Sequence, residues 1–233
     1  MSYTSLKEEV FEANIRLVKS GLVILTFGNA SGADRSAGVL AIKPSGVKYE
    51  EMTPNDMVIV AIEDGKVVEG KLRPSSDTPT HCVLYRSFAG VGGIVHTHST
   101  HATAWAQACE EIPAFGTTHA DHFFGPVPVT RQLTADEIEE DYEGHTGRVI
   151  ADRFIRFGLN PAETPGVLVA HHGPFTWGKN AEYACVNAIA LEAVACSAIL
   201  TLGINPLARE TSPAQLAKHY LRKHGPGAYY GQK

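Results

Sequence analysis

The sequence has no closely spaced cysteine pairs and no excess of positive charge, and both absences narrow the class of protein. Its 233 residues include four cysteines, none of them in a CxxC pair. Scattered cysteines favour reduced thiols in a cytoplasmic protein over a disulfide framework. With 20 basic against 25 acidic side chains the net charge is −5. This balance predicts no nucleic-acid partner and no attraction to a membrane surface, and it favours a small polar ligand.

Long uninterrupted apolar runs are missing as well. The most hydrophobic segment, 181–202, is broken by two glutamates and an asparagine. We expect it to be a buried core helix and not a membrane span, with Asn180 as its N-cap and Gly203 as its C′ residue. The stretch 4–20 carries apolar residues at helical spacing between charges, which predicts an amphipathic helix and no signal peptide.

The order of the predicted elements is typical of an α/β protein, and no repeat or linker divides the chain, so we expect one domain over 1–233. Asp64 and Gly65 lie between two apolar runs and predict a hairpin, so part of the sheet should be antiparallel. The predicted strands are 22–27, 38–42, 57–62, 66–69, 93–97, 127–130 and 166–170. The predicted helices lie near 4–20, 77–90, 99–109, 145–158, 179–203 and 212–224.

Two histidines close one of these strands, in the stretch GIVHTHSTH (93–101). His96 and His98 are two residues apart, so on a strand both imidazoles leave the same face and can converge on one cation. His101 falls where the next helix begins and need not belong to the set. The alternative is a hydrogen-bonded core or surface role, although two buried imidazoles would then need two partners.

The run GVLVAHHGPFTWG (166–178) repeats the pattern of an apolar strand, then histidine, then a turn marked by glycine. It supplies either His171 or His172 as a third nitrogen ligand, and strand alternation does not choose between these neighbours. Three imidazoles leave a coordination position open on Zn²⁺ or a similar divalent ion, which is typical of a catalytic metal site.

Three loops combine small residues, serine hydroxyls and backbone N–H groups in a way that can hold a phosphate. They are GNASG (28–32), KPSG (43–46) and RPSSDTPTH (73–81). Lys43 and Arg73 add positive charge. Each loop alone could be an ordinary turn. The absence of a GxxxxGK[ST] pattern argues against a nucleotide P-loop.

Two carboxylates and a tyrosine complete the candidate residues. Asp77 precedes a predicted helix, where its expected role is an N-cap. Asp121 lies between two histidines in FGTTHADHFFG. A surface turn is its default role, although a desolvated carboxylate near a cation would suit proton transfer. The tail from Gly225 reads as irregular, and composition alone predicts that Tyr230 is disordered.

Together these motifs resemble the epimerase branch of the class II aldolase/adducin family over essentially the whole chain. The resemblance is carried by HTHSTHATAWAQA, GTTHADHFFG, KPSG, RPSSDTPTH, PGVLVAHHGPFTWGKNAE and KHYLRKHGPGAYYGQ. It implies a central, largely antiparallel sheet flanked by helices. It also implies a fourfold-symmetric homotetramer with active sites between subunits, and one Zn²⁺ or another divalent ion such as Mn²⁺ per subunit.

The resemblance further implies roles for individual residues. Asp77 matches a carboxylate close to the metal, where the sister aldolases have a glutamate. The implied histidine ligands are His96, His98 and His172, and His171 falls at a position that varies in the family. The implied phosphate-binding residues are Ser45, Gly46, Ser75 and Ser76, with Asn29 and Lys43 nearby. The implied proton-transfer pair is Asp121 and Tyr230, with Tyr230 reaching the site of a neighbouring subunit.

The implied activity is the interconversion of L-ribulose 5-phosphate and D-xylulose 5-phosphate. Because C4 is not adjacent to the C2 carbonyl, cleaving C3–C4, rotating the aldehyde and rejoining it at its other face is easier than deprotonating C4. A bound metal would stabilise the enediolate charge. The alternatives are a class II sugar-phosphate aldolase of the L-fuculose-phosphate type, a metal-dependent hydrolase, and a non-catalytic module as in the adducin branch. Arabinose and ascorbate catabolism fit the resemblance equally well.

Overall fold

One seven-stranded sheet runs through the structure, a computed structural model that describes residues 3–230. The strand order is β4-β3-β2-β1-β5-β7-β6, and every neighbouring pair is antiparallel. The expected α/β fold with a largely antiparallel sheet is therefore confirmed. The strands are β1 (Asn29–Asp34), β2 (Val39–Ile42), β3 (Val58–Ala61), β4 (Val67–Glu69), β5 (Gly93–His96), β6 (Gly166–Val169) and β7 (Gly173–Gly178).

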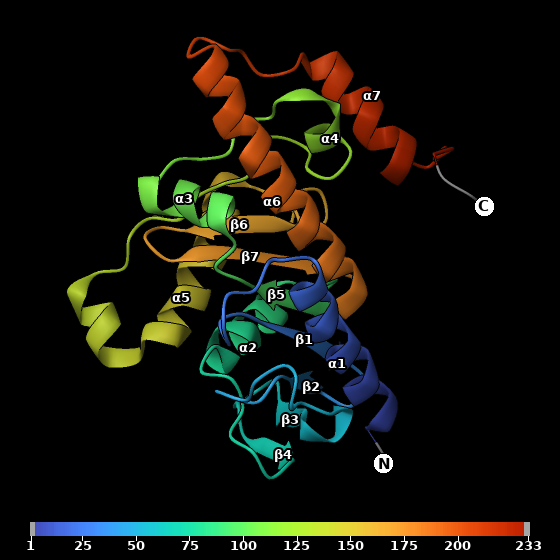
Figure 1. Cartoon of the computed structure of the whole chain (residues 1–233), viewed down its shortest axis with the longest axis vertical. Helices are drawn as coiled ribbons and strands as arrows, with labels where there is room; N and C mark the ends of the chain where they lie inside the picture. The colour runs from blue at the N-terminus through green and yellow to red at the C-terminus, as the bar shows by residue number, and fades with distance from the viewer. Residues whose placement is uncertain (1–2, 231–233) are drawn as a thin grey trace.

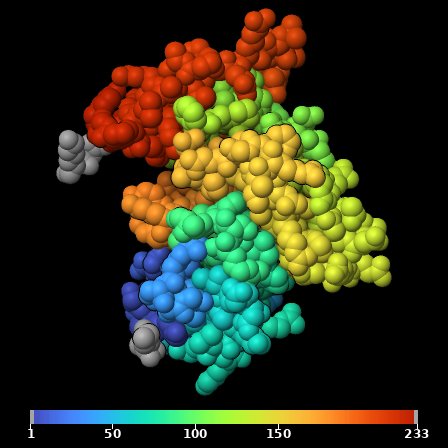
Figure 2. Space-filling model, turned by 180° about the vertical axis from the view of Figure 1, so that it is seen from behind, coloured from blue at the N-terminus to red at the C-terminus, as the bar shows by residue number. Residues whose placement is uncertain are grey.

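Helices cover both faces of this sheet (Figure 1). The amphipathic α1 and the apolar α6 pack against one face. Helices α2 and α5 pack against each other on the opposite face, which is turned toward the viewer in Figure 2. The helices are α1 (Thr4–Lys19), α2 (Thr78–Ser87), α3 (Thr100–Ala108), α4 (Gly116–Ala120), α5 (Ala135–Phe157), α6 (Ala181–Ile204) and α7 (Pro213–His224), with a 3₁₀ turn, η1 (Pro54–Asp56).

Strand alternation divides the hydrophobic core into its two main layers. In β2, Leu40 and Ile42 join the cluster that contains α2 and α5, whereas Val39 and Ala41 join the cluster that contains α1 and α6. Because successive side chains of a strand point to opposite faces, one apolar strand serves both layers. For this reason the sequence of a strand that is buried on both faces, such as β2, is a continuous run of apolar residues.

The predicted strand 22–27 is wrong, and the true strand follows it. Residues 22–27 form turns and coil, and β1 covers most of the GNASG stretch that the sequence presents as a loop. Small residues suit this central position because helices pack closely above it: a Cβ at Gly32 would lie 3.0 Å from Cγ2 of Val10 and 3.6 Å from Cβ of Ala181. Packing, and not β-propensity, places this strand.

Three further boundaries differ from the predictions. The predicted strand 127–130 makes only isolated bridges, Val127 with Ile112 and Val129 with Leu168. The GPFTWG stretch, where no strand is predicted, is strand β7, which pairs with both β5 and β6. Helix α5 starts ten residues before the predicted 145, because Thr134 and Glu137 form a capping box.

The signals at turns and caps were more reliable. Asp64 and Gly65 do connect the antiparallel strands β3 and β4, with Gly65 at φ +72°. The Asn180 side chain accepts a hydrogen bond from the backbone N–H of Tyr183, as expected of an N-cap. Gly203 is not the C′ residue, because α6 continues to Ile204.

Helix α6 is a core helix of the sheet, as predicted. By length and composition alone it could cross a membrane, and 39% of its most apolar 18-residue window is buried. It contacts β5, β7, α1 and α3. Its C-terminal end projects beyond the sheet, where Leu200 is 61% and Ile204 87% exposed. Part of an apolar helix is therefore left uncovered by this chain at that end.

Candidate metal and substrate site

Three histidines meet where β5 ends and where the chain turns from β6 into β7. The donor atoms of His96, His98 and His172 all lie within 4.8 Å of one another. His96 is the last residue of β5 and lies opposite Phe175 of β7 in the sheet register. The sheet therefore brings together two segments that are more than seventy residues apart in sequence.

The structure separates the two residues of the histidine doublet. His172 belongs to the cluster, whereas His171 is exposed and its Nε2 lies 3.5 Å from Sγ of Cys109. His171 has a left-handed backbone, with φ +60°, and its N–H bonds the carbonyl of Ala106 at the end of α3. This turn directs the neighbouring imidazoles apart. Of the two neighbours between which strand alternation did not choose, His172 is therefore the one that lies with His96 and His98.

The chemistry of the three imidazoles fits a divalent cation. Nδ1 of His96 lies 3.0 Å from the carbonyl oxygen of Pro174, to which it donates, so its Nε2 faces the cluster. That Nε2 lies 3.1 Å from Nε2 of His98. Burial and the neighbouring imidazoles lower the pKa of His98, and they lower the pKa of His172 to about 3. Neutral imidazoles with converging lone pairs are the form that binds a metal.

Asp77 occupies the N-cap position of α2, but its side chain makes no capping bond. Its Oδ2 instead accepts a hydrogen bond of 2.7 Å from Nδ2 of Asn29. The expected capping role of its side chain is therefore wrong. Burial raises the pKa of Asp77, but His96, His81 and the Asn29 hydrogen bond outweigh this effect, so the pKa lies below its ordinary value. An ionised carboxylate thus faces the same cavity as the histidines.

The second and third of the predicted phosphate loops, 43–46 and 73–81, line one cavity with the histidine cluster. The first stretch contributes Gly28 and Asn29 but not Ser31, whose Oγ lies near His81 and Tyr85 instead. This histidine cavity has a volume of about 400 Å³. Two backbone hydrogen bonds hold its second and third loops together: Ser45 N–H to the carbonyl of Arg73 at 2.9 Å, and Ser75 N–H to the carbonyl of Lys43 at 3.0 Å. The predicted phosphate-binding residues that line the cavity are Asn29, Lys43, Ser45, Gly46, Ser75 and Ser76.

Lys43 brings positive charge to the wall of this cavity. It is 2% exposed, and its Nζ lies 4.7 Å from the centroid of the Tyr49 ring. Burial lowers the pKa of Lys43. A buried cation needs a counter-charge, and an anionic ligand in the cavity would supply one.

Helix α5 adds two residues that the sequence reading missed. Tyr142 and Glu143 line the histidine cavity, and the hydroxyl oxygen of Tyr142 lies 3.3 Å from Nδ1 of His172. Burial, Asp77 and Glu143 raise the pKa of Tyr142, so its phenol keeps its proton. The spacing of Asp141 and Gly144 just before the predicted helix 145–158 was the available signal, since an aspartate commonly caps such a start.

Asp121 and Tyr230 do not line the histidine cavity of their own chain. Asp121 ends α4 and accepts hydrogen bonds from two residues of α7: Arg222, at 2.7 Å, and His219, at 3.1 Å. The Tyr230 ring lies against the same Arg222, whose Cζ is 4.5 Å from the ring centroid. These four residues are called the Asp121 cluster below. In Figure 1, α4 and α7 lie at the end of the molecule opposite β4.

The electrostatics of the Asp121 cluster favour an ionised carboxylate. Burial raises the pKa of Asp121, but the hydrogen bonds from Arg222 and His219 outweigh it, so the pKa is lowered. The expected disorder of Tyr230 is wrong, because its backbone N–H bonds the carbonyl of Arg222 at 3.2 Å. The rest of the predicted irregular tail, residues 231–233, lies outside the described residues.

The fold and this site define a class of protein. Residues 8–199 match the family described as the class II aldolase and adducin N-terminal domain. The chain belongs to the class II aldolase/adducin family, as the sequence motifs suggested.

Individual relatives narrow the comparison. The chain is 54% identical over 228 residues to L-ribulose-5-phosphate 4-epimerase UlaF of Salmonella paratyphi B (strain ATCC BAA-1250 / SPB7), covering 98% of this chain and 99% of that protein. The protein of the same name from Salmonella typhi matches with the same identity and coverage. Among solved structures, an L-fuculose 1-phosphate aldolase superposes with a TM-score of 0.77 at 26% identity, covering 94% of this chain and 97% of that one.

Proposed function

We propose that this protein is an epimerase that interconverts L-ribulose 5-phosphate and D-xylulose 5-phosphate. The observation that carries the proposal is the histidine cavity, in which three imidazoles, Asn29 and the serine-bearing loops 43–46 and 73–81 face the same space. A metal centre beside a phosphate cradle is what a retro-aldol reaction on a sugar phosphate requires. The 54% identity to UlaF over nearly the full length supports the epimerase over other members of the family.

His96, His98 and His172 would hold one divalent ion per subunit, Zn²⁺ or Mn²⁺, with Asp77 close by. When bound, the ion supplies a Lewis acid that stabilises negative charge developing on the substrate. The chain's own contribution is to keep the imidazoles neutral and convergent. Asn29 links the carboxylate beside the histidines to the third loop, since its Nδ2 donates to Oδ2 of Asp77 at 2.7 Å and to Oγ of Ser75 at 3.2 Å.

The phosphate anchor distinguishes an epimerase from an aldolase. Ser45, Gly46, Ser75 and Ser76, with Asn29 and Lys43, would hold the phosphate through hydroxyl, N–H and ammonium donors. While the phosphate is anchored, a base removes the C4 hydroxyl proton, the C3–C4 bond breaks, and its electron pair remains on the three-carbon fragment as an enediolate. The aldehyde rotates, C3 adds to its other face, and the new C4 alkoxide regains a proton.

Asp121 and Tyr230 would transfer these protons on opposite faces of the aldehyde, from a neighbouring subunit. Neither residue lines the histidine cavity of its own chain, and this supports a homotetramer with sites between subunits. The exposed apolar end of α6 supports the same assembly, because a second copy would cover Leu200 and Ile204. A tetramer of this kind would be cytoplasmic and would need no membrane and no nucleic acid.

The L-fuculose 1-phosphate aldolase neighbour makes a sugar-phosphate aldolase the second candidate. The test is to incubate the protein with L-ribulose 5-phosphate and to measure both D-xylulose 5-phosphate and free glycolaldehyde phosphate. Formation of the ketose that a chelator abolishes supports the epimerase. Stoichiometric free aldehyde would mean an aldolase, released inorganic phosphate would mean a hydrolase, and no turnover would leave a non-catalytic module.

A further inference from the structure

Helix α5 consists of two helices joined at Asp141. This residue has φ −162° and ψ 75°, which is not helical, and its Oδ1 accepts a hydrogen bond of 3.2 Å from the backbone N–H of Gly144. Asp141 is therefore the N-cap of the second half of the helix. A Cβ at Gly144 would overlap the Asp141 carboxylate. Glycine at this position is what allows the carboxylate to fold back onto the helix.

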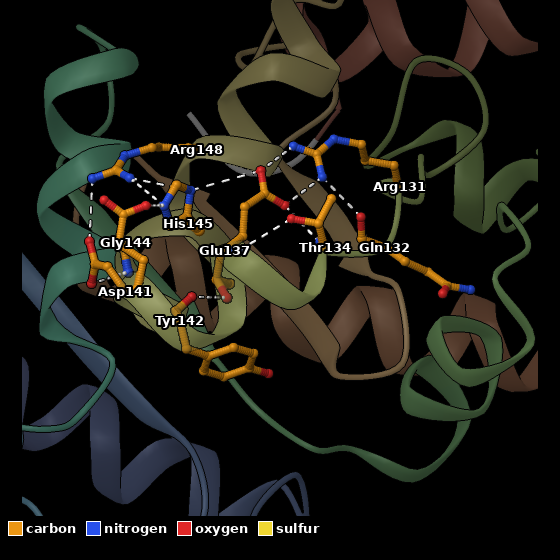
Figure 3. Close-up of polar contacts among 11 residues, drawn as sticks. Arg131, Gln132, Thr134, Glu137, Asp141, Tyr142, Gly144, His145 and Arg148 are labelled. Atoms are coloured by element: carbon orange, nitrogen blue, oxygen red, sulfur yellow. Dashed lines mark hydrogen bonds and ion pairs between the residues drawn. The ribbon is translucent and has the colours of Figure 1, made fainter.

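Polar contacts join the first half of α5 to the second (Figure 3), with Nδ1 of His145 at 3.8 Å from Oε1 of Glu137. Glu137 accepts two hydrogen bonds from Arg131, at 2.7 and 2.6 Å, and closes the capping box with Thr134. From the second half, Arg148 reaches back to Oδ2 of Asp141, with Nη2 at 3.3 Å. The kink is thus held from both sides by charged groups.

The kink decides where Tyr142 points. Figure 3 shows the Tyr142 ring directed away from the side chains of Glu137, His145 and Arg148. On that side its hydroxyl oxygen lies 3.3 Å from Nδ1 of His172, and the two rings are 5.9 Å apart at an angle of 33°. A regular helix through residue 141 would turn the side chain of residue 142 in another direction.

The imidazoles of His96 and His172 differ in how the nitrogen that faces away from the cluster is held. His96 uses a backbone acceptor, the carbonyl of Pro174, whereas Nδ1 of His172 faces the Tyr142 hydroxyl. A partner on the outer nitrogen fixes the tautomer and the ring orientation of a metal ligand. For His172 this partner comes from a different element, and its place depends on the Asp141 cap.

We infer that Tyr142 is a positioning residue for His172, presented by the internal cap at Asp141. Its hydroxyl oxygen accepts the Nδ1–H of His172, which leaves Nε2 of that imidazole as the ligand atom. The inference rests on the metal site of the proposed function. It adds that metal affinity depends on the helix kink, through a residue that does not itself bind the ion.

The experiment measures Zn²⁺ affinity without substrate, by competition with a chromophoric chelator on metal-free protein. Tyr142→Phe should bind Zn²⁺ about 10- to 100-fold more weakly than the native chain. Tyr183→Phe, at a half-exposed position on α6, is the matched control and should bind as the native chain does. Thermal unfolding of the metal-free Tyr142→Phe variant should be unchanged, which separates positioning from a general loss of stability.

Variants of the cap test the second half of the inference. Asp141→Ala and Gly144→Ala should weaken Zn²⁺ binding in the same direction as Tyr142→Phe, whereas Asp141→Asn keeps a capping oxygen and should restore near-native affinity. Native Zn²⁺ affinity in Tyr142→Phe overturns the inference. Native affinity in Asp141→Ala removes the role of the cap. If the native chain binds no Zn²⁺, or binds it equally well as His98→Asn, the proposed metal site itself fails.

Discussion

The histidine cavity and the Asp121 cluster differ in whether their polar groups already have partners within the chain. In the cavity, burial lowers the pKa of His172 and of Lys43, and the donor atoms converge on open space. In the cluster, Asp121 is already paired with Arg222 and His219. The first region is arranged to receive a ligand, whereas the second has satisfied its charge within the chain. One chain thus carries an open region lined by polar donors and a separate region whose charges are already paired.

The largest expected effect concerns the histidine doublet, at the centre of the cavity. His172→Ala should remove bound metal and reduce kcat/KM by at least about 1,000-fold, or roughly 4 kcal/mol. His171→Ala is the matched control, because that imidazole is exposed and faces Cys109, and it should retain most activity. Metal content and steady-state rates measure both. The reverse result would mean that His171 binds the metal.

The next effect tests whether the two regions meet between subunits. Asp121→Asn and Tyr230→Phe should each reduce turnover by about 10²- to 10⁴-fold, as expected when a proton-transfer group is lost. Hybrids formed by mixing Asp121→Asn subunits with His98→Asn subunits should regain activity, because some interfaces then pair a native histidine cavity with a native Asp121 cluster. Mixing Asp121→Asn with Tyr230→Phe should not restore activity, because both residues contact Arg222 of the same chain. This requires the histidine cavity and the Asp121 cluster to serve one site from different chains.

Inactive hybrids of Asp121→Asn with His98→Asn, with mixed subunits verified by mass, would mean that the cavity and the cluster do not meet between subunits or that the cluster takes no part in the chemistry. Each variant re-mixed with itself is the control. It separates complementation from the effect of dissociating and reassembling the subunits.

The loops of the cavity predict a smaller effect. Each charge-assisted hydrogen bond to phosphate that is lost costs about 1.5–3 kcal/mol, or roughly ten- to a hundredfold in retention of the aldehyde. Ser45→Ala and Ser76→Ala should therefore epimerise more slowly and release more glycolaldehyde phosphate per turnover, measured with a trapping dehydrogenase. Ser36→Ala, at an exposed position, should match the native protein. Absence of trapped aldehyde from both loop variants would argue against carbon–carbon cleavage.

The smallest expected effect concerns His81, which lies behind the cavity. This residue should make the free energy of unfolding depend on pH. His81 is fully buried, and its Nδ1 lies 2.7 Å from Oγ of Ser31. Burial lowers the pKa of His81 to about 3, from 6.5, and His96 adds to this while Asp77 opposes it. Between pH 6.5 and about 3, the His81 imidazole is protonated in the unfolded chain but not in the folded chain. Its contribution to stability is therefore complete above pH 6.5 and falls as pH drops toward 3.

The slope should reach about 1.4 kcal/mol per pH unit for this group. Urea unfolding of metal-free protein at pH 7, 6 and 5 measures it. His81→Gln should flatten the dependence, whereas His171→Gln should not. An unchanged slope in His81→Gln would mean that other groups carry the pH dependence.

What the sequence by itself determined is local. The amphipathic α1, the hairpin at Asp64 and Gly65 and the cap at Asn180 follow from residue patterns a few positions long. Sequence motifs likewise identified His96, His98 and the serine-bearing loops as candidate site residues, because the binding chemistry of these side chains can be recognised before the fold is known.

Tertiary structure decided the features that depend on distant packing. Strand β1 is made of small polar residues with little β-propensity, and its place between β2 and β5 comes from the close approach of α1 and α6. The Asp77 side chain left its expected cap because Asn29, far away in sequence, lies beside it. Tyr142 reaches His172 only because α5 bends at Asp141. Each of these contacts joins residues that are distant in the sequence, and no local sequence pattern indicates that they meet. They form only when the fold brings the segments together.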